Sequence, residues 1–214
     1  MAFDLDDTLF DRRSALCRLL ESWLGADQAG SAAEEIIAAD GNGHRPRSVF
    51  FAWLAGRFPS LIANGPELAA RFRRELPACI EPDSDVLDSL GQLEADGIPI
   101  ALLSNGSAAF QQEKLRACGA IPFFQKSHRL FSSALGFEKP DPRAFHALIE
   151  VLEAEPPEIL FVGDDPLRDI EGARGAGLRS CRLRRPDREV MERDADLVID
   201  SFQELAGILR TKCA

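Results

Sequence analysis

The pattern of apolar and polar positions divides the chain into two kinds of sequence. After Phe10, apolar residues recur at helical spacing for roughly 70 residues, which predicts a run of four helices. From Pro82 onward, short apolar runs alternate with helical patterns, which predicts strands and helices in turn. The predicted strands lie at 98–103, 128–131, 159–162, 179–183 and 197–199. This alternation is typical of a parallel sheet covered by helices on both faces.

A further short apolar segment, Ala2-Phe3, runs directly into acidic residues and predicts a buried strand that ends in a loop. The next strand is expected roughly ninety residues later, whereas a crossover between parallel strands needs only a dozen or so. The sequence therefore predicts an α/β core formed by 1–10 and 80–214, with an all-helical domain inserted at 11–79. A central strand is usually longer, which indicates either a short first strand or a natural start further upstream.

Composition limits the classes of protein to which this chain can belong. The chain has 214 residues, of which 45% are hydrophobic, and its formal net charge is −10. This hydrophobic content supports a sizeable core and excludes a disordered chain, and the acidic balance argues against a nucleic-acid partner. We expect no membrane helix and no signal peptide, because no apolar run is long enough. The five cysteines are scattered and odd in number, which indicates reduced thiols in a cytoplasmic protein.

Two acidic residues, Asp4 and Asp6, follow the first predicted strand, and Thr8 comes next. Alternation along an extended strand end would place Asp4 and Asp6 on the same side. Neighbouring carboxylates repel each other, so the pair needs a cation, a shared proton or both. A solvated acidic loop or a helix N-cap is the alternative interpretation. An EF-hand calcium loop is excluded, because Leu and Ala occupy the positions that require Gly and Glu.

Polar residues also follow the strand predicted at 98–103. Ser104, Asn105 and Gly106 stand there at the start of a predicted helix. A hydroxyl and free N–H groups at a helix N-terminus can bind an anion. Ser or Asn in this position is equally an ordinary helix cap, so the segment alone leaves both interpretations open.

A third group of polar residues follows the strand predicted at 159–162. Gly163, Asp164 and Asp165 come directly after it, and Asp169 lies one helical turn further on. Open parallel sheets bind ligands at the carboxyl ends of their strands, and carboxylates gathered there suit a divalent cation with oxygen ligands. Lys139, followed by proline, stands between these segments in the chain. A lone lysine usually faces solvent. The position of Lys139 between these segments instead favours a role in the predicted binding site.

Together these four segments resemble the haloacid dehalogenase-like (HAD) hydrolase superfamily. Its D-x-D-x-T motif matches the segment from Asp4 to Thr8, its Ser or Thr after a strand matches Ser104, and its lysine matches Lys139. Its acidic G-D-x(3–4)-D turn matches the segment from Gly163 to Asp169. The resemblance covers about 2–10 and 98–178, and it implies a Rossmann-like core. The helical insert resembles the C1 cap of subfamily I.

The resemblance also implies a reaction. Asp4 would be the nucleophile that attacks phosphorus and forms an aspartyl-phosphate. Asp6 would protonate the leaving oxygen and then take a proton from the attacking water. Mg²⁺ would bind the Asp4 carboxylate, the Asp6 backbone carbonyl and the Asp164 carboxylate.

The remaining motif residues would bind or support the phosphoryl group. Ser104, the N–H groups near Asn105 and Gly106, and the Lys139 ammonium would hold its oxygens. Asp169 would orient Lys139 or a metal-bound water. Thr8 would support the residues that bind the phosphoryl group and the metal. Asp165 is expected to be a supporting or structural acid.

We therefore expect a cytoplasmic, Mg²⁺-dependent phosphatase that acts on a small phosphorylated metabolite, as a monomer or weak homodimer. A phosphomutase on the same fold is one alternative. A 2-haloacid dehalogenase is another, but attack on carbon needs neither a metal nor an acid such as Asp6. A non-catalytic binding protein would be expected to lack at least one motif residue. In the insert, Arg45 and Arg47 are either solvated charges or substrate contacts.

Overall fold

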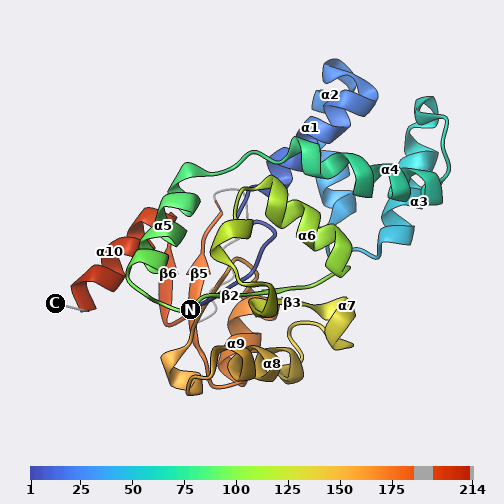
Figure 1. Cartoon of the computed structure of the whole chain (residues 1–214). Helices are drawn as coiled ribbons and strands as arrows, with labels where there is room; N and C mark the ends of the chain where they lie inside the picture. The colour runs from blue at the N-terminus through green and yellow to red at the C-terminus, as the bar shows by residue number, and fades with distance from the viewer. Residues whose placement is uncertain (186–194, 213–214) are drawn as a thin grey trace. The chain divides into compact units, whose positions relative to one another are not determined.

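The structure is a computed structural model that describes residues 1–185 and 195–212. It divides into two compact units: Met1–Phe10 with Pro82–Ala214, and Asp11–Glu81. Each unit is described by itself, and Figure 1 shows the elements of both. Within the described residues, no helix combines the length and the apolar character that crossing a membrane requires.

The first unit is built on a parallel sheet. Among the described residues six strands form it, in the order β3-β2-β1-β4-β5-β6. Their bounds are β1 (Ala2–Phe3), β2 (Ala101–Ser104), β3 (Arg129–Phe131), β4 (Leu160–Gly163), β5 (Arg179–Leu183) and β6 (Leu197–Ile199). The two-residue β1 lies at the centre, where Phe3 is in register with Leu102 on one side and Val162 on the other. The α/β class and the parallel sheet predicted from the alternating pattern are confirmed.

Helices cover both faces of this sheet (Figure 1). They are α5 (Ser84–Ala95), α6 (Ala108–Ala117), α7 (Ser132–Leu135), α8 (Pro142–Leu152), α9 (Gly172–Gly175) and α10 (Phe202–Lys212). Four short helical turns accompany them: η3 (Ile121–Phe123), η4 (Lys126–His128), η5 (Pro156–Glu158) and η6 (Pro166–Glu171). On one face, Ala2 and Phe161 pack in a core with Phe145 of α8. On the other, the Phe3 ring contacts the rings of Phe124 and Phe202.

Two predicted elements differ in detail. The strand predicted at 98–103 begins at Ala101, because Pro99 has no N–H to contribute to a strand ladder. The helical pattern that follows the strand predicted at 159–162 forms a π-helical turn, η6, followed by α9, instead of one continuous α-helix. π-Helical turns often occur at functional sites. This one follows directly after the acidic residues at the end of β4.

The second unit is helical. It contains α1 (Arg12–Leu24), α2 (Ala26–Asp40), α3 (Arg47–Arg57) and α4 (Gly65–Glu75), with the 3-10 turns η1 (Pro59–Leu61) and η2 (Leu76–Cys79). Its core is aromatic, since the ring of Phe51 packs edge-on against the rings of Phe50 and Phe72. Apolar residues at helical spacing therefore form the interior of this unit.

A buried ion-pair cluster closes the end of α2 in the helical unit. The Asp40 carboxylate binds the Arg12 guanidinium at 2.8 and 3.0 Å and the Arg47 guanidinium at 2.6 Å. Burial acts to raise the pKa of Asp40, but the two guanidinium groups outweigh it and lower that pKa to about 2. Arg47 is thus engaged by Asp40, whereas Arg45 is exposed. A substrate contact by either arginine stays a prediction.

Candidate active site

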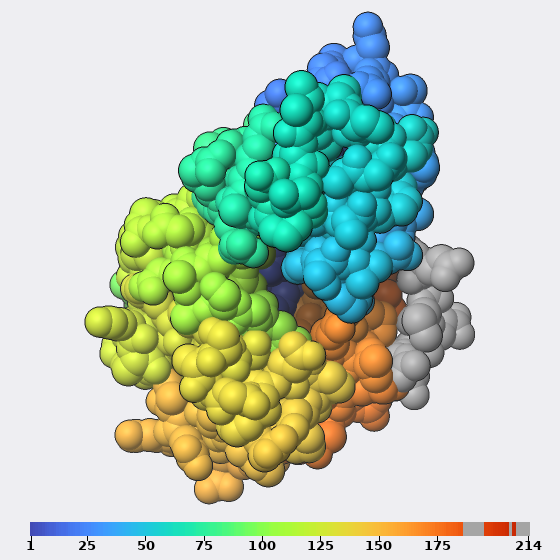
Figure 2. Space-filling view, turned by 90° about the vertical axis from the view of Figure 1, so that its right-hand side faces the viewer, coloured from blue at the N-terminus to red at the C-terminus, as the bar shows by residue number. Residues whose placement is uncertain are grey.

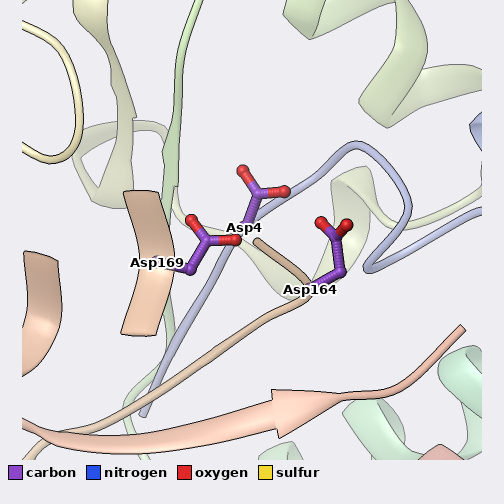
Figure 3. Close-up of side chains that lie close together, drawn as sticks. All are labelled: Asp4, Asp164 and Asp169. Atoms are coloured by element: carbon purple, nitrogen blue, oxygen red, sulfur yellow. The ribbon is translucent and has the colours of Figure 1, made fainter. Parts of the chain in front are cut away.

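Three carboxylates meet at the carboxyl edge of the sheet. Asp4 follows β1 directly, and its N–H donates to the carbonyl of Val162 at 2.9 Å. Asp164 follows β4, the neighbour of β1, so parallel register brings the two acids to the same edge. Asp169 approaches from η6. One carboxylate oxygen from each residue lies within 4.8 Å of the other two, and all three residues are buried. Figure 3 shows the three side chains close together.

Lys139 lies between two of these carboxylates, those of Asp4 and Asp169. Its ammonium nitrogen is 2.6 Å from Asp4 Oδ1 and 2.7 Å from Asp169 Oδ1, and the residue is only 2% exposed. The other oxygen of Asp169 accepts the N–H of Asp165 at 3.0 Å. Asp169 therefore contacts the same ammonium group that contacts Asp4. Its expected role in orienting Lys139 or a metal-bound water stays a prediction.

The charges of this group are strongly coupled. Burial raises the pKa of Asp4 to about 7; Lys139 opposes this shift, and the carboxylates of Asp169 and Asp6 add to it. Burial would lower the pKa of Lys139, but Asp169 and Asp4 outweigh it and raise that pKa above its usual range. Lys139 therefore stays cationic at neutral pH. Three buried carboxylates against one ammonium leave a negative excess, which fits a divalent cation with oxygen ligands.

Gly163 is required by the close approach of Asp169. A Cβ atom at residue 163 would lie 2.6 Å from the Cβ atom of Asp169, and the Asp169 carboxylate would be closer still. Only glycine lets the η6 backbone turn back over the end of β4 in this way. The Gly163-Asp164 pair at the end of β4 therefore serves packing as well as charge.

The segment after β2 holds Lys139 in place. Ser104 ends β2 and is buried. The Asn105 amide donates to the carbonyl of Lys139 at 2.9 Å and accepts the N–H of Lys139 at 2.9 Å. The predicted role of Asn105 lay in its backbone, and sequence reasoning missed this side-chain clamp. The N–H of Gly106 donates to Ser132 Oγ at 2.8 Å, so α7 also supports this loop. Phosphate binding by these residues stays a prediction.

Asp6 faces a different set of side chains from Asp4. Strand β1 ends at Phe3, so strand alternation does not extend to Asp6. Its carboxylate lies 2.8 and 2.9 Å from Lys114 Nζ and 3.0 Å from Gln111 Nε2. Sequence reasoning missed both α6 residues. The available signal was a glutamine and a lysine three positions apart, on one face of the helix that follows a motif segment.

The turn after Asp4 has further support. The Thr8 hydroxyl donates to Asp4 Oδ2 at 3.4 Å. Asp7 adopts a left-handed conformation with φ of 58°, and its carbonyl accepts the Arg185 Nε–H at 2.7 Å. On the face shown in Figure 2, the N-terminal segment is visible as a small dark-blue area beside the green and orange parts of the same unit. Asp165 caps η6 by accepting the N–H groups of Leu167 and Arg168. Its expected role as a supporting or structural acid stays a prediction.

Comparison with known proteins now identifies the family. A family model described as haloacid dehalogenase-like hydrolase matches residues 1–177. The chain belongs to this family of HAD-like hydrolases.

Relatives of this HAD-like hydrolase include a phosphatase and a dehalogenase. The glyceraldehyde 3-phosphate phosphatase of Methanopyrus kandleri is 31% identical over 97% of this chain and 95% of its own length. The (S)-2-haloacid dehalogenase 2 of a Pseudomonas species is 32% identical over 69% of this chain and 66% of its own length. Among solved structures, the HAD-hydrolase YfnB of Bacillus subtilis, bound to magnesium, matches 97% of this chain and 96% of its own at 26% identity, with a TM-score of 0.72.

Proposed function

We propose that this HAD-like hydrolase is a Mg²⁺-dependent phosphatase that cleaves a small phosphorylated metabolite through an aspartyl-phosphate on Asp4. The observation that carries the proposal is the convergence of Asp4, Asp164 and Asp169 at one edge of the sheet, where Lys139 contacts Asp4 and Asp169. The phosphatase named among the relatives, which spans nearly the whole chain, supports the same choice.

In this proposal the Asp4 carboxylate attacks phosphorus. One of its oxygens is held by Lys139 and the other by Thr8, so the group is oriented before substrate arrives. The Lys139 ammonium and the Ser104 hydroxyl would bind phosphoryl oxygens and offset their charge. Phosphoryl transfer depends mainly on such positioning and charge stabilisation.

Asp4 and Asp164, with the backbone carbonyl of Asp6, would hold the Mg²⁺. The bound ion would neutralise charge on the phosphoryl group and reduce its repulsion from the nucleophile. The carboxylate cluster fits this role, because its oxygens are close together and carry a negative excess. Asp169 is committed to Lys139 and to the N–H of Asp165, so we assign it a supporting place rather than a ligand position.

Asp6 would act as acid and then as base. It would give a proton to the leaving oxygen when Asp4 attacks, and it would take one from the water that cleaves the aspartyl-phosphate. This carboxylic acid, two residues after the nucleophile, has no task in simple displacement of halide from carbon. Its presence favours phosphatase over dehalogenase chemistry.

The second candidate is a 2-haloacid dehalogenase, and the Pseudomonas relative is the observation that favours it. A phosphomutase on the same fold is a further alternative. We infer that the helical unit, predicted from the sequence at 11–79, is a cap domain that contributes specificity. A cytoplasmic location and a monomeric or weakly dimeric state belong to the same proposal.

One assay separates these functions. The purified protein is supplied with Mg²⁺ and a panel of small phosphate esters that includes glyceraldehyde 3-phosphate, and in parallel with 2-haloacids. Release of inorganic phosphate, lost by orders of magnitude in Asp4→Asn, would support the proposal. The matched control is Asp88→Asn, the same change at an exposed site on α5. Halide release without phosphate release, or full phosphatase activity in Asp4→Asn, would overturn it.

A further inference from the structure

Helix α6 (Ala108–Ala117) turns two polar side chains inward. Gln111 is 2% exposed and Lys114 is 5% exposed, so both are buried in the first unit. Burying an amide or an ammonium costs free energy unless partners are supplied. The contacts of these two residues therefore show what their burial serves.

Gln111 joins the two segments proposed to carry the chemistry. Its Nε2 atom lies 2.6 Å from Ser104 Oγ, 2.7 Å from the carbonyl of Asn105 and 3.0 Å from Asp6 Oδ2. An amide NH₂ has only two hydrogens to share among these three acceptors. Gln111 is thus a bridge between the acid after β1 and the hydroxyl at the end of β2.

Lys114 holds the same carboxylate from one turn further along the helix. Its Nζ lies 2.8 Å from Asp6 Oδ1 and 2.9 Å from Asp6 Oδ2, a two-oxygen contact. The ammonium also lies 4.6 Å from the centre of the Phe110 ring, an attractive cation–π distance. The Lys114 side chain is 6% exposed, whereas the Asp6 side chain is 25% exposed. The Asp6 carboxylate is therefore held by α6 while part of its side chain stays accessible to solvent.

We propose that Gln111 and Lys114 are positioning residues that fix the direction of the Asp6 carboxylate for proton transfer. This inference rests on the proposed function, in which Asp6 serves the leaving oxygen and the water. Asp6 lies beyond the end of β1, in a turn that continues into the left-handed Asp7, so regular strand structure does not orient it. Side chains from α6 supply the orientation instead.

The bridge through Gln111 adds a second consequence. Ser104 is a proposed ligand of the phosphoryl group, and Gln111 binds its hydroxyl and the Asp6 carboxylate with one amide nitrogen. The acid and the phosphoryl ligand are thereby kept at a constant separation. Displacing reacting groups by about 1 Å can cost roughly 100-fold in rate.

The test compares substrates that differ in their need for an acid. An alkyl phosphate has a poor leaving group that requires a proton, whereas 4-nitrophenyl phosphate has a good one that does not. In Lys114→Met and Gln111→Leu we expect kcat for glycerol phosphate to fall about 10- to 100-fold, with a smaller loss for 4-nitrophenyl phosphate and little change in KM. Lys114→Arg, which keeps the charge, should recover part of the rate.

Matched controls are available in the same unit. Lys126→Met makes the same change at an exposed lysine of η4, and Gln112→Leu makes it on α6 itself at the neighbouring position. Both should retain wild-type kinetics on the two substrates. Circular dichroism and the unfolding midpoint of each variant would show whether it is folded.

A crystal structure of Lys114→Met provides a readout that needs no activity. We expect the Asp6 carboxylate to rotate away from α6 or to adopt more than one conformation. Equal kcat losses on both esters, or an Asp6 carboxylate unchanged in place and order, would overturn the inference. A wild-type protein that hydrolyses no phosphate ester would instead contradict the proposed function, and the crystal structure would still decide whether α6 positions Asp6.

Discussion

Lys139 and Asp4 are 135 positions apart in the sequence, yet the Lys139 ammonium lies 2.6 Å from Asp4 Oδ1 in a buried site. Asp169 and the Asn105 amide hold the lysine there from two other directions. The arrangement keeps one positive charge beside the proposed nucleophile before any substrate or metal binds.

The first prediction concerns this contact. Lys139→Met should lower the phosphatase kcat by about 100-fold or more, because a cation that stabilises phosphoryl charge is lost. Removing the cation should also raise the pKa of Asp4 further, so the acid limb of the pH–rate profile should move to higher pH. The profile of Lys126→Met serves as the control. An unshifted acid limb would show that Lys139 does not act on Asp4.

The second prediction concerns the metal. EDTA should abolish phosphatase activity, and added Mg²⁺ should restore it, because the carboxylate cluster carries excess negative charge. Calcium prefers more ligands and longer bonds, so it should bind yet support little turnover. Mg²⁺ should also raise the unfolding midpoint of the wild type, and it should raise the midpoint of Asp164→Asn much less. Full phosphatase activity in chelator would contradict the proposed metal requirement.

The third prediction concerns Gly163. In Gly163→Ala the added Cβ would overlap Asp169, so η6 must shift and the Lys139 contact must loosen. We expect a loss of about 2 kcal/mol in unfolding free energy, together with a marked fall in kcat. Gly175→Ala is the control, because a Cβ there meets nothing within 4 Å. Denaturant unfolding of both variants measures the difference, and equal stability would contradict the packing argument.

The fourth prediction concerns the helical unit and pH. Asp40 has a pKa of about 2 in the folded protein, below the 3.8 of an unperturbed aspartate. The ionised carboxylate therefore makes its full contribution to the free energy of unfolding above about pH 4. This contribution is lost as pH falls from about 4 toward 2, when the carboxylate is protonated. Asp40→Asn should cost about 3 kcal/mol near neutral pH, because Arg12 loses its buried partner. Denaturant titrations of both proteins should show this difference narrowing below pH 4; a constant difference would contradict the assignment.

The sequence by itself determined the fold class and the family. Apolar runs of strand length alternating with helical patterns specify a parallel sheet covered by helices, because each element must bury its apolar side. Parallel strands all present their carboxyl ends at one edge, so Asp4 and Asp164 could be brought together without knowledge of the coordinates. The acid-rich segments after the first and fourth strands therefore predicted a metal and phosphate site. The roles of its individual residues stay predictions.

Only the tertiary structure decided which long side chains enter the site. Periodicity tells which side of α6 faces the core, but not that Gln111 and Lys114 reach Asp6, more than 100 positions away. In the same way, the sequence left the segment with Asn105 open between an anion site and a helix cap, and did not predict that the Asn105 amide binds the Lys139 backbone. Such contacts depend on the angle and distance between segments that are remote in the chain. Residue preferences and sequence spacing do not predict these angles and distances, because the packing of the whole core sets them.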